Sequence, residues 1–240
     1  ETWPESDLEM IDVTANEYIS SSTPFHVYYM TVSGHVNYNF YGNYIALKNK
    51  PYVDNLPYSD ESKAYIAGNL EVEFAMKSLI DKLDKAGVLK NTVISIVPDH
   101  YPYGLAIESI NELAGHEVEK NFELYKSIFI LWKSGMRPIT LDKSMSTLYI
   151  LPTLSNLFGL EYDSRLLMGN DIFSGVSPLV IFLNRSWITD KTRYNSITGG
   201  VDDKNVSSDY VVGINKIVAN KFKYSTKVLE TNYYDKIGAK

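Results

Sequence analysis

A long amphipathic pattern, followed at once by a short apolar run, constrains the fold most. Between residues 60 and 86 apolar side chains recur every three or four positions, and residues 92–97 read TVISIV. The first pattern predicts a helix that ends near Gly87. The second is typical of a strand that is covered on both faces of a parallel sheet. Because segment 25–33 is also rich in strand formers, we expect a right-handed βαβ unit.

The remaining chain continues this alternation of helical and strand-like segments. Helical spacing occurs over 6–19, in the second half of 144–160 and over 207–223, and further strand-like runs are 127–133, 178–184 and 192–198. The alternation predicts an α/β fold with three layers and a mostly parallel sheet. The last two strand-like runs and the final helix predict a small antiparallel and helical part near the C-terminus.

Turn formers and acidic residues cluster at 199–209. Such a cluster favours a boundary between domains. We therefore expect a main domain over residues 1–198 and a helical extension over residues 199–240.

Composition excludes several classes of function. The 240 residues carry 23 Lys and Arg against 29 Asp and Glu, a net charge of −6, which argues against nucleic acid as a partner. The absence of cysteine excludes disulfides, thiolate metal sites and a cysteine nucleophile. Apolar runs reach about five residues, whereas a membrane-spanning helix needs about 20, so we expect no membrane span in this chain.

The dipeptide Asp99-His100 directly follows the strand-like run 92–97. In open α/β sheets ligands bind beyond the carboxyl ends of strands, and a carboxylate beside an imidazole is a pair of ligands for a divalent cation. The alternative is an ordinary turn in which Asp99 bonds its own backbone and His100 faces water.

His35 follows segment 25–33, so it would share a rim with Asp99 and His100 if the two strands are neighbours. It is a candidate for substrate binding, and the alternative is a loop histidine without a role. His26 and His116 are expected to be structural or solvated. The sequence has no nucleophile elbow, P-loop or dinucleotide-binding glycine motif.

Five motifs occur in an order that resembles a known family. They are 31-TVSGHVNY-38, 91-NTVISIVPDHYPYG-104, 127-SIFILWKSGM-136, 150-ILPTLSNLFGL-160 and 167-LMGNDIFS-174. Together they resemble the sulfatase-type domain of lipoteichoic acid synthases, the phosphoglycerol transferases of the alkaline phosphatase superfamily. The resemblance runs from about Asp7 to Thr198 and implies an α/β/α sandwich of the alkaline phosphatase and sulfatase kind.

The resemblance also implies roles for single residues. Asp99 and His100 match the family's pair of ligands to the catalytic metal, Mn²⁺ or Mg²⁺, and His35 matches a histidine near the phosphoglycerol group. The family's threonine nucleophile and a glutamate ligand lie N-terminal to the matched stretch. We therefore expect the C-terminal portion of a larger enzyme, with no catalytic nucleophile in this chain, weak or absent metal and no activity alone. Two positions depart from the family pattern: Asn37 replaces a proline, and Tyr149 replaces an aspartate.

The activity implied by the resemblance is transfer of glycerol phosphate from phosphatidylglycerol in the synthesis of lipoteichoic acid or another cell-envelope polymer. The implied location is the extracellular face of the cell membrane, with membrane association through a missing N-terminal segment. An unpaired sheet edge in such a portion also predicts a homo-oligomer. The alternatives are another enzyme of the superfamily, such as a sulfatase or a phosphoethanolamine transferase, and a non-catalytic module that binds an envelope polymer.

Overall fold

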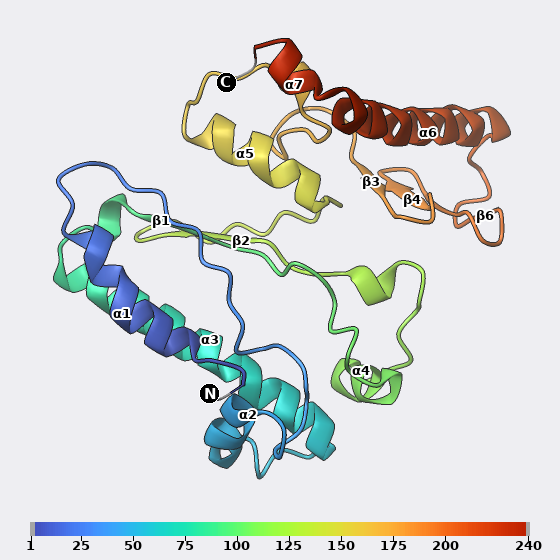
Figure 1. Cartoon of the computed structure of the whole chain (residues 1–240). Helices are drawn as coiled ribbons and strands as arrows, with labels where there is room; N and C mark the ends of the chain where they lie inside the picture. The colour runs from blue at the N-terminus through green and yellow to red at the C-terminus, as the bar shows by residue number, and fades with distance from the viewer. Residues whose placement is uncertain (1–2, 239–240) are drawn as a thin grey trace. The chain divides into compact units, whose positions relative to one another are not determined.

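The computed structural model describes residues 3–238, and the chain divides at 138/139 into two compact units (Figure 1). The predicted division at 198/199 falls inside the second unit, between two strands of one sheet, and it stays a prediction. No helix within residues 3–238 is both long enough and apolar enough to cross a bilayer.

The first unit contains the two helices that the spacing of apolar residues predicts, over 6–19 and 60–86, and two further helices that were not predicted, at 44–49 and 107–114. They are α1 (Asp7–Ile19), α2 (Tyr44–Asn49), α3 (Asp60–Lys85) and α4 (Ile107–Ala114), with short 3-10 turns at Lys50–Tyr52, Leu89–Asn91 and Glu123–Tyr125. The side chain of Ser6 caps the start of α1, and that of Ser59 caps α3. Helix α3 ends as predicted, because Gly87 adopts the left-handed conformation (φ +74°) that closes a helix C-terminus.

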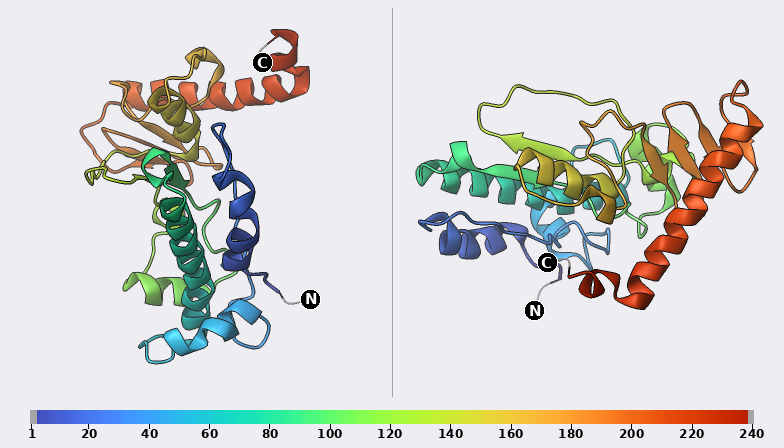
Figure 2. Two further views of the ribbon diagram at one scale, coloured as in Figure 1. Left: turned by 90° about the vertical axis from the view of Figure 1, so that its left-hand side faces the viewer. Right: turned by 90° about the horizontal axis from the view of Figure 1, so that it is seen from above.

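Helices α1 and α3 lie side by side in both views of Figure 2 and enclose the main core of this unit. Ile94 and Trp132, from two paired strands, pack against this core. The buried members of the core are Ile11, Ala15, Ile19, Ala75, Leu79, Leu83 and Leu89. A second buried cluster joins α2 to the N-terminal half of α3 through Ala46, Val53, Ala64 and Ala67.

The sheet of the first unit corrects two expectations. Strand β1 (Val93–Ile96) pairs with β2 (Ile130–Lys133) in antiparallel register, so within residues 3–238 no parallel pair forms and the mostly parallel sheet is absent. Residues 24–32 have no regular secondary structure. The predicted strand at 25–33 and its βαβ unit were therefore wrong for this chain. Strand-forming side chains make a strand only where a neighbouring strand accepts the backbone hydrogen bonds, and within residues 3–238 no strand pairs with this segment.

The second unit places a helix on a small antiparallel sheet. Strands β3 (Leu179–Ile181), β4 (Trp187–Thr189), β5 (Arg193–Asn195) and β6 (Gly200–Val201) pair in that order. Trp187 is fully buried, stacks on Tyr194 at 5.4 Å and donates from Nε1 to Oδ1 of Asn215 at 2.8 Å. The other elements are α5 (Ile150–Leu157), α6 (Ser208–Thr231), α7 (Tyr233–Lys236) and 3-10 turns at Thr147–Tyr149 and Ser164–Leu166. The predicted antiparallel and helical C-terminal part is confirmed.

Candidate functional site

Asp99 and His100 lie in the loop that follows β1. Their side chains are 83% and 41% exposed, and Oδ2 of Asp99 is 3.4 Å from Nε2 of His100. The other ring nitrogen, Nδ1, is 2.7 Å from the carbonyl oxygen of Tyr101. Because a carbonyl can only accept, Nδ1 carries the proton of that hydrogen bond, and Nε2 of the neutral ring presents a lone pair. A lone pair and a carboxylate oxygen that face each other favour a cation between them.

His35 lies in a loop whose main chain is tied down on both sides. Its N–H donates to the carbonyl of Val32 at 3.0 Å, and its carbonyl accepts from Nδ2 of Asn43 at 3.2 Å. The indole of Trp3 packs edge-on against the partly buried imidazole, with ring centroids 5.6 Å apart. Within residues 3–238 Nε2 of His35 has no hydrogen-bond partner. One ring nitrogen is therefore available to a ligand.

Asp7 holds the chain immediately before His35. Its two carboxylate oxygens accept the N–H groups of Val32 at 2.9 Å and of Ser33 at 3.0 Å. In return the N–H of Asp7 donates to Oγ of Ser33, and this hydroxyl donates to the carbonyl of Glu5. Asp7 and Ser33 are both buried. The first turn of α1 therefore fixes the loop of His35. Sequence reasoning considered Asp7 only as a possible cap of the first helix and missed its contact with the loop of His35.

The loop of His35 meets the loop of Asp99 and His100 at one point. A Cβ atom on Gly104 would stand 2.2 Å from Cγ1 of Val36 and 3.5 Å from Cε2 of Tyr38. Burial, together with negative charge on neighbouring groups that include Asp99, raises the pKa of Tyr38 to about 12. Tyr103 stacks at a tilt on His100, with ring centroids 4.6 Å apart. The loops of all three predicted site residues therefore meet, although segment 25–33 forms no strand.

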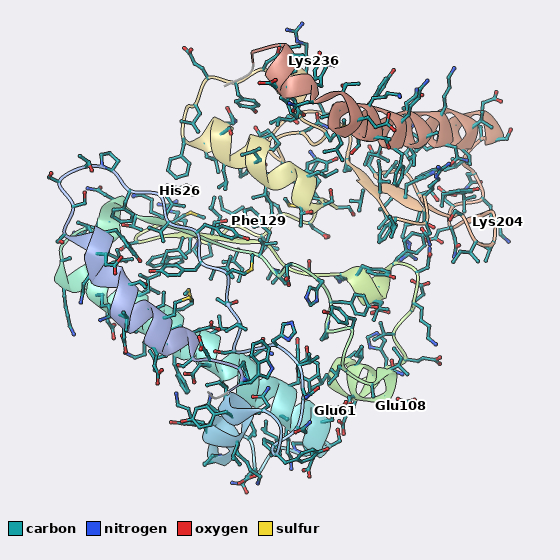
Figure 3. The ribbon with its side chains drawn as sticks, viewed as in Figure 1. His26, Glu61, Glu108, Phe129, Lys204 and Lys236 are labelled. Carbon is teal, nitrogen blue, oxygen red and sulfur yellow. The ribbon has the colours of Figure 1, made fainter. Side chains whose placement is uncertain are left out.

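Two glutamates fix the far end of the Asp99 loop by capping each other's helices. Glu61, in the first turn of α3, accepts the N–H of Ala106 and the hydroxyl of Ser109 at the start of α4. Glu112, on α4, accepts from the N–H and hydroxyl of Ser59 at the start of α3. Figure 3 shows Glu61 and Glu108 on the two helix ends that meet here. Neither contact was predicted from the sequence.

The other two histidines and the two positions that depart from the family pattern are exposed or make contacts that hold the fold together. His26 is exposed on the segment before the His35 loop (Figure 3). His116 pairs with Oε1 of Glu123 at 2.7 Å. Tyr149 is buried, and its hydroxyl accepts from the N–H of Leu179 at 2.8 Å, so it anchors β3. The carbonyl of Asn37 accepts from Nδ2 of Asn43 at 2.9 Å.

The donor set of the Asp99 loop fits a divalent cation only in part. Within residues 3–238 no group of three or more histidine, aspartate and glutamate side chains is placed to hold a metal ion. Asp99 and His100 supply one oxygen donor and one nitrogen donor, 3.4 Å apart. Hard cations take about six donors, so this pair is part of a site.

Comparisons with known proteins agree with the sequence motifs. Residues 2–160 match the model of the Sulfatase family. The chain is 26% identical to the protein named "Lipoteichoic acid synthase-like YvgJ" of Bacillus subtilis, over 82% of this chain and 32% of that protein. It is 24% identical to "Lipoteichoic acid synthase" of Staphylococcus aureus, over 75% of this chain and 28% of that protein. The chain thus spans about a third of the length of the curated relatives that it matches.

Proposed function

Because this chain belongs to the sulfatase family, with an α/β fold of the alkaline phosphatase kind, we propose that it is part of a metal-dependent phosphoglycerol transferase. Its donor would be phosphatidylglycerol, and its product lipoteichoic acid or a related cell-envelope polymer. We propose the extracellular face of the cell membrane as its place of action. The contact between Val36 and Gly104 carries the proposal, because it joins the loop of His35 to the loop of Asp99 and His100.

Asp99 and His100 would hold the divalent cation, Mn²⁺ or Mg²⁺. The hydrogen bond from Nδ1 of His100 to the carbonyl of Tyr101 supports this role, because it fixes the ring with Nε2 toward Asp99. When bound, such a cation lowers the pKa of an attacking hydroxyl and neutralises charge on phosphoryl oxygens. Two ligands leave most of the coordination shell to water or to groups outside these residues.

His35 would contact the phosphoglycerol group. The bonds from Asp7 to Val32 and Ser33, and the packing of Trp3, hold the imidazole in one place before substrate arrives. A fixed ring loses little conformational entropy on binding. The imidazole can donate to a phosphate oxygen or to a glycerol hydroxyl through the free Nε2.

No residue of this chain is proposed as the nucleophile. The family resemblance implies a threonine in a stretch that these residues do not match. We therefore propose that this chain supplies part of the metal site and one substrate contact, and that the attacking oxygen comes from another part of the enzyme.

Binding to the purified chain tests this proposal. Mn²⁺ should broaden the NMR resonances of residues 99–104, and sn-glycerol 3-phosphate added with Mn²⁺ should shift the resonances of His35. Asp99→Ala and His100→Ala should remove the Mn²⁺ effect, and His35→Ala should remove only the response to glycerol phosphate. The matched controls are His26→Ala and Asp84→Ala, which change exposed side chains away from these loops. Broadening that survives both ligand variants would contradict the metal assignment.

A further inference from the structure

The second unit contains a pocket that the proposed function does not use. It lies between the segment 165–168, the C-terminal half of α6 and α7, and it has a volume of about 620 Å³ (α6 and α7 are red in Figure 1). Two side chains hold its wall in place. Nζ of Lys221 donates to the carbonyl of Met168 at 2.6 Å, and the hydroxyl of Tyr234 donates to the carbonyl of Leu166 at 2.7 Å.

Three cationic side chains line this pocket, in a chain whose net charge is −6. Arg165 is paired with Asp163, and Lys227 is paired with Glu230. Lys221 differs from them, because no carboxylate within residues 3–238 forms an ion pair with it. Its ammonium group is partly buried, and burial lowers the pKa of Lys221 below its ordinary value. The bond to Met168 uses one of three N–H donors, so two are left for an anion.

The rest of the wall near Lys221 is mainly apolar. Leu167, Met168 and Ile217 line the pocket together with Val228 and the ring of Tyr224. Ile217 and Tyr224 are 45% and 58% exposed. A free phosphate or a bare sugar would leave this apolar surface in water. A ligand that covers it must carry an apolar chain beside its negative charge.

We propose that this pocket binds an anionic phospholipid, with the phosphate on the ammonium group of Lys221 and an acyl chain along Leu167, Met168 and Ile217. The occupant follows from charge complementarity: a partly buried cation without an ion-pair partner among residues 3–238 lies beside an apolar wall. An anionic lipid satisfies both features at once, because its phosphate pairs with the cation and its chain removes the wall from water. The pocket shares no lining residue with the loops of His35 and Asp99, so the proposal does not rest on the proposed function.

Calorimetric titration of the whole chain with short-chain lipids below their micelle concentration tests this site. Dihexanoyl phosphatidylglycerol should bind at least about tenfold more tightly than dihexanoyl phosphatidylcholine, whose choline group cancels the charge. It should also bind more tightly than sn-glycerol 3-phosphate, which has no acyl chain. Raising the NaCl concentration should weaken binding of the anionic lipid to the unmodified chain.

Variants of Lys221 identify the site. Lys221→Met keeps the length of the side chain and removes its charge, and should weaken binding of the anionic lipid about tenfold or more. Lys221→Arg should retain most of the affinity. The matched control is Lys223→Met, an exposed lysine two positions further along α6, which should leave the affinity unchanged.

Several results would overturn the proposal. Equal affinity for the choline lipid would show that the pocket does not recognise the negative charge. Equal affinity for glycerol phosphate would show that it does not recognise the acyl chain. If Lys221→Met leaves the affinity unchanged, the lipid binds somewhere other than this pocket. If no lipid binds to the unmodified chain, the proposal is wrong. If Lys221→Met unfolds the chain, the salt dependence and the comparison of lipids on the unmodified chain still test whether charge and acyl chain are recognised together.

Discussion

Gly104 approaches Val36 so closely that a Cβ atom on Gly104 would lie 2.2 Å from Cγ1 of Val36. Two unbonded carbon atoms are in van der Waals contact at about 3.5–4.0 Å, so no other residue fits at position 104 without movement. Glycine at this position allows the loop of Asp99 and His100 to cross the loop of His35. The candidate site depends on this crossing, because no strand pairing joins the two loops.

Gly104→Ala should destabilise the chain by about 1–3 kcal/mol, because the added methyl group must displace Val36 or part the loops. Thermal and urea unfolding measure the loss. The double variant Gly104→Ala with Val36→Ala should recover most of it, since the second change removes the atom that clashes. Gly175→Ala is the control, because a Cβ there meets nothing within 4 Å. Equal destabilisation by the single and double variants would show that Val36 is not the obstacle.

Glu71→Ala should cost about 3 kcal/mol of unfolding free energy. Glu71 is fully buried and accepts hydrogen bonds from Ser6, from Nζ of Lys48 at 2.8 Å and from Nδ2 of Asn49 at 2.9 Å. Hydrogen bonds to a buried charged group are worth about 1.5–3 kcal/mol, and their loss leaves the side chain of Asn49, within residues 3–238, with only its bond to the carbonyl of Ala67. Glu73→Ala, an exposed position on the same helix, should change stability by less than about 0.5 kcal/mol. Urea unfolding compares the two variants, and similar losses would contradict the role of Glu71.

The capping contact of Glu112 should make stability depend on pH in the acid range. Hydrogen bonds from the hydroxyls of Ser59 and Ser62 hold the pKa of Glu112 below its ordinary value of 4.5. Because the folded-state pKa is depressed, the contribution is present above pH 4.5 and is lost as pH falls through the folded-state pKa. Glu112→Gln should therefore lower the melting temperature at pH 7 and have less effect at pH 2.5. A decrease that is the same at both pH values would exclude this linkage.

The chain alone should show no turnover and only weak metal binding. Asp99 and His100 are two ligands where Mn²⁺ takes about six, and no residue here is proposed as the nucleophile. We expect substoichiometric Mn²⁺ after gel filtration, and no release of glycerol phosphate from a phosphatidylglycerol analogue. A longer protein that carries the implied threonine should bind Mn²⁺ stoichiometrically and release glycerol phosphate. Asp99→Ala in that protein should abolish both the metal binding and the release. Tight Mn²⁺ together with metal-dependent hydrolysis by the 240-residue chain would falsify this prediction.

Self-association should occur through the β1–β2 pair. Within residues 3–238 this sheet has two strands, so each strand has an unpaired edge. Ile130, the first residue of β2, is 40% exposed, and Ile128, two residues before it, is 65% exposed. Unpaired apolar edges promote pairing between chains. Light scattering should show a mass that rises with concentration, and Ile128→Lys should suppress the rise. Val13→Lys, on an exposed part of α1, should not suppress it; a monomer at every concentration would contradict the prediction.

The sequence predicted the helices more accurately than the sheet, and the reason is physical. The signals that start and end α1 and α3, such as Ser6, Ser59 and Gly87, act over a few neighbouring residues. A strand depends on a partner from elsewhere in the chain. Segment 25–33 has the residues of a strand but pairs with no other strand in the described part of the chain, whereas Trp187–Thr189 forms a strand too short to show any period.

The sequence predicts which residues form the candidate site, and this stays a prediction; it does not predict the contacts that hold their loops. Asp99 and His100 are neighbours in the sequence, and the family motif indicates His35. The supporting contacts join residues far apart along the chain: Asp7 with Ser33, Glu61 with Ser109, and Glu112 with Ser62. A single sequence gives no distance between such residues, because only the packing of α1, α3 and α4 brings them together.

The bond between Asp7 and the Val32–Ser33 backbone has a consequence for moving this site into another protein. The loop of His35 does not contain the acceptors for the amide groups of Val32 and Ser33; it takes them from the first turn of a helix that begins more than twenty residues earlier. A graft of residues 31–38 alone would leave the buried N–H of Ser33 and the partly buried N–H of Val32 without partners, and an unsatisfied buried donor costs about 1–3 kcal/mol. The transplantable unit is therefore discontinuous: it comprises the loop and the start of α1, and a host must supply both in the same relative position.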